Sequence, residues 1–112
     1  MDRIALLAAL ADCSLPLRDL ATGIVEVEWD GEGDAVPLLG RQLAAVLKRH
    51  LAGELSAADV ELWAAMVESR EDIILDPENE EALEYALYEL ANPDMTQPLT
   101  PERAEEFVRF FG

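Results

Sequence analysis

Apolar side chains recur at every third or fourth position in several stretches of this chain, which is the spacing of an amphipathic α-helix. The clearest stretch lies over residues 37–52, where Pro37 suits the first helical position and Gly53 ends the pattern. Its apolar positions are Leu39, Leu43, Val46, Leu47 and Leu51, and its polar positions are Arg41, Gln42, Lys48 and Arg49. Because the two sets fall on opposite sides of a helix, we predict a helix here with one buried face.

The next helix is predicted by its cap as well as by its apolar positions. Ser56 is followed three residues later by Asp59, an arrangement typical of a reciprocal cap at a helix N-terminus. The inward positions are Val60, Trp63, Ala64 and Val67, with Leu62 and Met66 beside them. Together they cover an arc of roughly 200°, wider than the ~100° that a surface helix needs. We therefore expect this helix to be the central one.

Three further helices complete the predicted bundle. Residues 2–12 form a short first helix, and another begins near Glu78 and ends at Asn92-Pro93. The last begins at Thr100-Pro101, a cap followed by a proline that suits the first turn. In these last two helices the inward positions are Leu83, Leu87 and Leu90, and Ala104, Phe107, Val108 and Phe111.

Residues 24–29 break the helical pattern. Val25, Val27 and Trp29 alternate with glutamates, as in a strand, and no second alternating stretch exists for pairing. This segment is either extended and packed on helices, or a helix that the pattern misrepresents. Before it, Pro16 opens a short turn that ends at Gly23, and residues 73–75 read as an apolar connector. We predict an all-α fold: one domain over residues 1–112, with about five helices and one extended segment near residues 24–29.

Composition narrows the class of protein. The chain has 24 acidic and 8 basic residues, a net charge of −16, while 51% of its residues are hydrophobic. That apolar content is too high for a disordered acidic tail, and a globule of this length has a radius of gyration of roughly 13 Å. Phosphate and anionic lipid both require clustered Lys and Arg, so we expect no nucleic-acid or membrane partner. No stretch approaches the ~18–20 apolar residues of a membrane span.

Cysteine usage and the first residues bear on the compartment. Cys13 is the only cysteine, so no disulfide can form within the chain. Residues 4–11 are apolar and precede Asp12-Cys13, but this stretch is short for a lipoprotein signal, and Asp12 stands where a small residue is needed. We expect a cytoplasmic protein.

The charge is unevenly distributed along the chain. Residues 54–100 contain thirteen acidic residues and one basic residue, whereas residues 36–53 contain three basic residues and no acidic one. The helix over residues 37–52 is therefore basic in an acidic protein. We expect its polar face to meet acids of the next two helices, which would ease self-repulsion; the alternative is plain solvation.

No arrangement of residues points to catalysis. His50, the only histidine, stands near a helix C-terminus, where the helix dipole favours it, and no nucleophile elbow or phosphate-binding glycine loop is present. Glu68, Glu71 and Asp72 surround Arg70, which favours local ion pairing over a hydrolytic carboxylate pair. We expect no enzyme activity and no cofactor.

One acidic run partly resembles a calcium loop. Asp30, Glu32 and Asp34 match the first three side-chain ligand positions of such a loop. The glycine expected next is Ala35, and Arg41 stands where the closing bidentate glutamate belongs. These three acids are thus weak metal candidates, and a solvated acidic loop is the simpler interpretation.

The helix that begins near Glu78 carries the best surface candidate. Tyr85 and Tyr88 lie one turn apart, away from the leucine face and beside Glu81 and Glu84. Tyrosine is favoured at interfaces because it combines rigid apolar area with a polar tip, and an acidic rim suits a basic partner. The alternative is that the N-terminal segment covers both rings.

Two resemblances accompany these observations. Residues 47–59 (LKRHLAGELSAAD), followed by Glu61-Leu-Trp63-Ala64, resemble the helix–Gly–Glu–apolar–Ser–helix corner of small acidic bacterial proteins of the colicin D immunity type. Residues 15–111 are similar to a set of uncharacterised bacterial proteins without an established function. The shared features are Trp29-Asp30, that corner, Glu68-x-Arg70-x-Asp72-Ile73, Leu90-Ala-Asn-Pro93 and Pro98-Leu-Thr-Pro101.

The immunity resemblance implies a single-domain inhibitor that neutralises a cognate toxin by covering a basic surface. An inhibitor of this kind would present a uniformly acidic face, whereas the helix over residues 37–52 is basic. The resemblance therefore does not identify the contact surface. We therefore expect a small, acidic, non-enzymatic binding protein for a basic protein partner. The alternatives are a homodimeric structural protein that buries the segment around Trp29, or a carboxylate-based metal-binding module.

Overall fold

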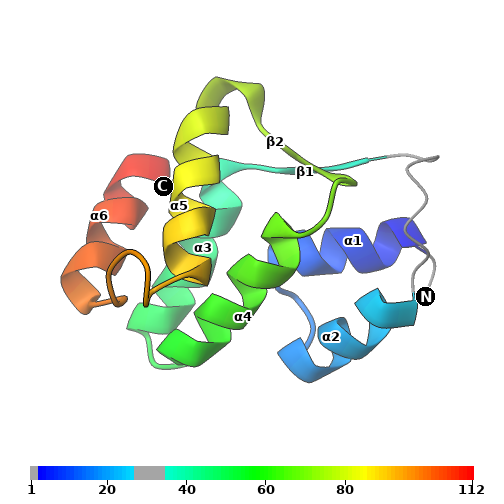
Figure 1. The fold of residues 1–112 in the computed structure, drawn as a ribbon, viewed down its shortest axis with the longest axis horizontal. Helices are drawn as coiled ribbons and strands as arrows, with labels where there is room; N and C mark the ends of the chain where they lie inside the picture. The colour runs from blue at the N-terminus through cyan, green and yellow to red at the C-terminus, as the bar shows by residue number, and fades with distance from the viewer. Residues whose placement is uncertain (1–2, 27–34) are drawn as a thin grey trace.

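The computed structural model describes residues 3–26 and 35–112, and Figure 1 shows that most of them are helical. The elements are α1 (Arg3–Asp12), α2 (Leu17–Glu26), β1 (Val36–Leu38), α3 (Gly40–Leu51), α4 (Ala57–Glu68), β2 (Ile73–Leu75), the 3-10 turn η1 (Pro77–Asn79), α5 (Glu80–Ala91) and α6 (Pro101–Phe111). The predicted all-α bundle is confirmed, with six α-helices among the described residues instead of about five. The radius of gyration, 13.3 Å, agrees with the expected value.

A short parallel β-pair departs from the prediction. β1 pairs with β2 in the register Val36–Ile73, Pro37–Ile74 and Leu38–Leu75. The Val36 N–H donates to the Asp72 carbonyl at 2.9 Å, and the Asp76 N–H donates to the Leu38 carbonyl at 3.0 Å. Since residues 36 and 38 make the ladder bonds, Pro37 faces away and loses none. The prediction that Pro37 begins a helix is wrong, and the apolar connector over residues 73–75 is a strand.

The C-terminal end of α2 lies where the sequence predicted an extended segment. Residues 24–26 are helical, so the expected extended conformation is wrong for them, and the helical alternative holds. Residues 27–29 lie outside the described part of the chain. Gly23 does not end the turn opened by Pro16 but lies inside α2, where an added Cβ would come within 3.0 Å of Leu6 Cδ1 on α1. A glycine here therefore allows α1 and α2 to approach closely.

α4 is the central helix, as predicted. It contacts α1, α2, α3 and α5, and its inward face is buried as far as Met66, whereas Leu62 at the other edge is exposed. Trp63 is fully buried, and its indole N–H donates a 2.7 Å hydrogen bond to the Leu10 carbonyl on α1. The bond satisfies the one polar atom of the ring, so the largest core side chain joins α4 to α1 at no polar cost.

The C-terminal half of the chain contains the candidate site. α5 packs on α4, and α6 packs on α3 with Ala104, Phe107 and Phe111 buried. In Figure 1, α6 and α5 lie next to each other at the end of the molecule away from α1 and α2. Among the described residues, none of the helices has both the length and the apolar content that a membrane crossing requires.

Candidate functional site

The four predicted binding residues lie together on the outer side of α5. Asp76 accepts a hydrogen bond from the Glu78 N–H in the turn that precedes α5. Leu83, Leu87 and Leu90 then face the core, as predicted. The opposite side presents Glu81, Glu84, Tyr85 and Tyr88, which we call the tyrosine ridge.

The tyrosine ridge is open to solvent in the described structure. Tyr85 is 57% exposed and Tyr88 is 40% exposed, and both flanking glutamates are exposed. The alternative was that the N-terminal segment covers both rings. α1 and α2 do not cover them, because these helices lie at the other end of the molecule (Figure 1). The ridge therefore offers two aromatic rings within an acidic surface.

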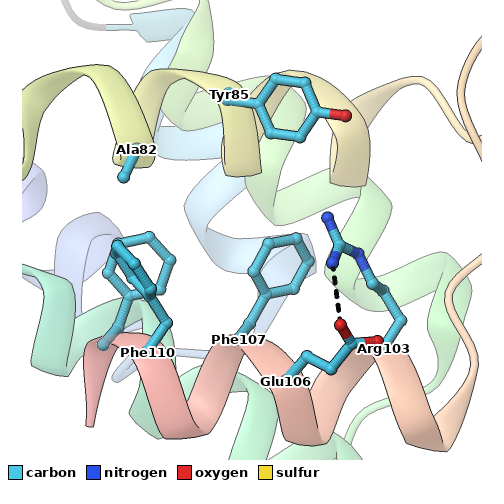
Figure 2. Close-up of a pocket in the computed structure, with 7 residues that line it drawn as sticks. Ala82, Tyr85, Arg103, Glu106, Phe107 and Phe110 are labelled. Atoms are coloured by element: carbon cyan, nitrogen blue, oxygen red, sulfur yellow. Dashed lines mark hydrogen bonds and ion pairs between the residues drawn. The ribbon is translucent and has the colours of Figure 1, made fainter.

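A groove between α5 and α6 borders the ridge. Its volume is about 280 Å³, and it is lined by Ala82, Tyr85, Arg103, Glu106, Phe107, Phe110 and Phe111. Figure 2 shows the Tyr85 ring lying along α5 on one side of the groove, with Phe107 pointing toward it from α6 on the other. Phe110 is 66% exposed and meets Phe111 edge-on at 4.9 Å between ring centroids. Tyr85 thus belongs to both the ridge and the groove.

One end of the groove is formed by Arg103, which is ion-paired to the buried Glu89. Arg103 Nε and Nη2 donate to the two carboxylate oxygens of Glu89 at 2.7 and 2.8 Å, and Glu89 is only 2% exposed. The pKa of Arg103 is raised, chiefly because its guanidinium donates these bonds to Glu89. Arg103 also lies 4.3 Å from the Phe107 ring centroid, a cation–π contact. The pair fixes the guanidinium against the aromatic floor of the groove.

Glu106 completes this end of the groove from the solvent side. Its carboxylate lies 3.4 Å from Arg103 Nη1, and its side chain is 54% exposed (Figure 2). Two carboxylates therefore share one guanidinium. The trio carries one net negative charge, which resides on the exposed member.

Sequence reasoning did not single out Phe110, Arg103 or Glu89. Phe110 was detectable as an aromatic residue out of phase with the inward positions Phe107 and Phe111. The Glu89–Arg103 pair joins residues fourteen apart on different helices. No local pattern identifies such a pair, because it depends on how the helices pack.

One of the three acids around Arg70, Asp72, belongs to a structural ion-pair network. Arg70 donates to both oxygens of Asp72 at 2.9 and 2.5 Å, and Arg3 donates to the same carboxylate at 2.9 Å. The hydrogen bonds from Arg70 lower the pKa of Asp72. Glu68 and Glu71 are exposed instead. The expected local pairing through Arg70 is confirmed, and its partner, Asp72, is engaged by two arginines.

Glu68 lies at the C-terminus of α4, and its pKa is shifted in the opposite direction to that of Asp72. Its pKa is raised first by partial desolvation of the carboxyl group, although the residue as a whole is exposed, and second by the nearby charge of Glu84. A carboxylate at a helix C-terminus also opposes the helix dipole. The acidic surface of the ridge therefore extends from Glu84 on α5 to Glu68 on α4.

The basic helix does not pair as predicted. In the part of the chain that the structure describes, the ion pair of α3 joins Arg49 to Glu54 in the following turn, at 3.1 Å. Arg49 also donates to the Cys13 carbonyl at 2.6 Å. Arg41 and Lys48 are exposed. The expectation that this helix meets acids of the next two helices is wrong for the described residues, and solvation accounts for Arg41 and Lys48.

His50 and Cys13, the other two side chains with reactive groups, are held by contacts within the fold. His50 Nδ1 lies 2.8 Å from the Leu55 carbonyl, and since a carbonyl only accepts, the proton is on Nδ1. Cys13 is buried, and burial raises the pKa of its thiol. Over residues 3–26 and 35–112, no cluster of three or more His, Cys, Asp or Glu side chains is arranged to hold a metal ion. Asp30, Glu32, Asp34 and Trp29 lie outside these residues.

Comparison with known proteins adds no analogue of this site. No family model, no curated protein and no solved structure matches the chain. Exposed aromatic rings beside uncommitted carboxylates provide apolar contact area together with attraction for cations, which suits recognition of a basic surface.

Proposed function

We propose that this chain is a small, acidic, non-enzymatic binding protein of the cytoplasm that binds a basic protein partner through the tyrosine ridge. The observation that carries the proposal is the exposure of Tyr85 and Tyr88 within an acidic surface. An immunity-like inhibitor, which covers a basic surface of a toxin, is the specific form that the sequence resemblance suggests.

The ridge combines the two contributions that a protein interface needs. Truncating an aromatic anchor at the centre of an interface typically costs about 2 kcal/mol or more of binding free energy. The carboxylates of Glu81 and Glu84 contribute little affinity at a rim, but they accelerate encounter with a basic surface and oppose acidic competitors. The net charge of −16 extends this attraction beyond the contact area.

Capture from a lysate of the source organism at low salt tests the proposal. The full chain is immobilised beside two variants, Tyr85→Ala/Tyr88→Ala and the control Ile4→Ala/Leu51→Ala. The control removes two side chains of similar exposure, 39% each, from α1 and α3. A captured basic protein is then purified, and its Kd is measured against each variant over a salt series.

We expect the tyrosine variant to lose at least about tenfold in affinity and the control to stay within about twofold. Because both side chains are exposed, at 57% and 40%, the free energy of unfolding of the tyrosine variant should differ from that of wild type by less than about 1 kcal/mol. If no basic protein binds the wild-type chain at low salt, or if both double variants bind equally, the proposal is wrong.

A further inference from the structure

We infer that the groove between α5 and α6 is an anchor site for one arginine side chain of the basic partner. The inference rests on the proposed function and extends it from a charged surface to a defined subsite. The shape of the groove, its charge and a contact already present within it support this assignment.

The shape fits one long side chain. Sites for drug-sized ligands typically occupy about 300–1,000 Å³, and the groove offers about 280 Å³. Tyr85 and Phe110 are its exposed aromatic walls, and the nearly buried Phe107 is its floor. Ala82 on α5 occupies little of the space opposite the phenylalanines, as Figure 2 shows. A guest side chain entering from solvent would therefore lie between aromatic rings.

The charge of the groove favours a cation. Glu89 is committed to Arg103 by two short hydrogen bonds in a buried setting. Glu106 is exposed and lies at the longer distance of 3.4 Å from the same guanidinium. Its carboxylate is thus the available one, and it is placed at the mouth of the groove. An anionic guest would meet this charge unfavourably.

Arg103 already demonstrates the chemistry that the guest would use. Its guanidinium lies on the Phe107 ring at 4.3 Å while its nitrogens donate to carboxylates. A planar guanidinium stacks on aromatic rings and binds a carboxylate through a fork of donors, which a lysine ammonium cannot do. Arginine is therefore the guest that matches both the exposed rings and Glu106.

A peptide titration followed by NMR tests the inference on the full chain. The probe is N-acetyl-Gly-Arg-Gly amide. It is compared with the same peptide carrying citrulline, the neutral isostere of arginine, and with the same peptide carrying lysine. Shifts are recorded for backbone amides of α5 and α6 in the ¹⁵N-labelled protein. The variants are Glu106→Gln and Phe110→Ala, with Glu105→Gln as the control. Glu105 is an exposed acid on the same helix that does not line the groove.

We expect saturable shifts confined to the groove with the arginine peptide, and much weaker shifts with the citrulline peptide. Glu106→Gln and Phe110→Ala should each weaken binding about two- to fivefold, and Glu105→Gln should leave it unchanged. All three side chains are exposed, so the spectra of the variants should retain the dispersion of the folded protein.

Three results would overturn the inference. If the citrulline peptide bound as tightly as the arginine peptide, the site would be apolar. If the lysine peptide bound as tightly as the arginine peptide, the site would have no selectivity for a guanidinium. If Glu105→Gln weakened binding as much as Glu106→Gln, the attraction would be diffuse. Failure of the anchor is distinguishable from failure of the proposed function. A captured basic partner whose affinity depends on Tyr88 and not on Glu106 or Phe110 would leave the ridge intact and remove the anchor alone.

Discussion

Glu89 illustrates how one residue determines the geometry of the groove. It lies on α5 at a position that is nearly inaccessible to water, and its charge is tolerated because Arg103 donates two hydrogen bonds to it. Gln97 Nε2 provides a third, longer contact at 3.4 Å. A buried carboxylate with such partners holds the α6 arginine in place, and with it one end of the site.

Glu89→Gln should therefore destabilise the protein by about 2 kcal/mol, because an amide NH₂ would face a guanidinium that cannot accept a hydrogen bond. The measurement is urea-induced unfolding at neutral pH. Glu106→Gln is the matched control, and since its side chain is 54% exposed the change should be below about 0.5 kcal/mol. Equal costs for the two variants would contradict the assigned roles of buried and exposed partner.

Asp72 makes stability depend on pH. Its pKa is lowered in the folded state by hydrogen bonds from Arg70, while the unfolded chain retains the ordinary value of about 4. A depressed pKa stabilises the fold fully above the unfolded value, and that contribution is lost as pH falls through the folded value. The contribution should be complete at neutral pH and disappear in acid.

The free energy of unfolding of wild type and Asp72→Asn should therefore differ most at neutral pH and converge below about pH 4. Urea titrations over a pH series measure the difference. Glu71→Gln, an exposed neighbour, controls for the general loss of one acid. A difference between wild type and Asp72→Asn that stays constant with pH would show that the carboxylate charge is not what stabilises this network.

At the scale of elements, helix ends were the most predictable feature. Ser56 Oγ accepts a hydrogen bond from the Asp59 N–H at 3.0 Å, and the Asp59 carboxylate accepts from the Ser56 N–H at 2.8 Å. Gly53 has φ of +87°, the left-handed conformation expected of a residue that ends a helix. Such features are readable because all the atoms involved lie within a few residues.

Ser56→Ala should lower stability by about 1 kcal/mol, and Ser56→Gly by only a few tenths, because glycine is tolerated at the cap. Thermal or urea unfolding measures both. The two variants share the loss of the hydroxyl, so equal and negligible changes would mean that the cap contributes nothing to α4.

The strands and the groove were less predictable because they depend on distant parts of the chain. β1 is three residues long, and its hydrogen-bonding partner β2 begins at Ile73, after two intervening helices. Pro37 is equally suited to a first helical turn and to the free side of an edge strand, so local preference could not decide. The tyrosine ridge was predictable from spacing on α5 alone, whereas the groove required Phe110 and Arg103 from α6.

At the scale of the whole molecule, repulsion among acids opposes folding. The strongest pairs, Glu89–Arg103 and Asp72–Arg70, use two of the eight basic residues, and most of the acids in the described part of the chain face solvent. Exposed charges are screened over about 10 Å at 0.1 M salt, whereas buried pairs are screened much less. Salt should therefore weaken the repulsion more than it weakens the pairs.

Raising NaCl from about 0.01 M to about 0.2 M should increase the stability of the protein by about 1 kcal/mol. Thermal unfolding at several salt concentrations measures the effect. Glu81→Gln/Glu84→Gln removes two charges from the ridge and should reduce the dependence on salt. A melting temperature that falls with salt would show that attraction among charges outweighs repulsion.

The parallel β-pair has a consequence for the order in which the chain folds during synthesis. The Val36 N–H bonds to the Asp72 carbonyl, so the pair cannot close until more than thirty further residues have left the ribosome. α3 waits longer still, because Phe107 and Phe111 of α6 cover it last. The part of α3 that α6 covers thus stays open until α6 has been made, and closure of the core coincides with completion of the groove.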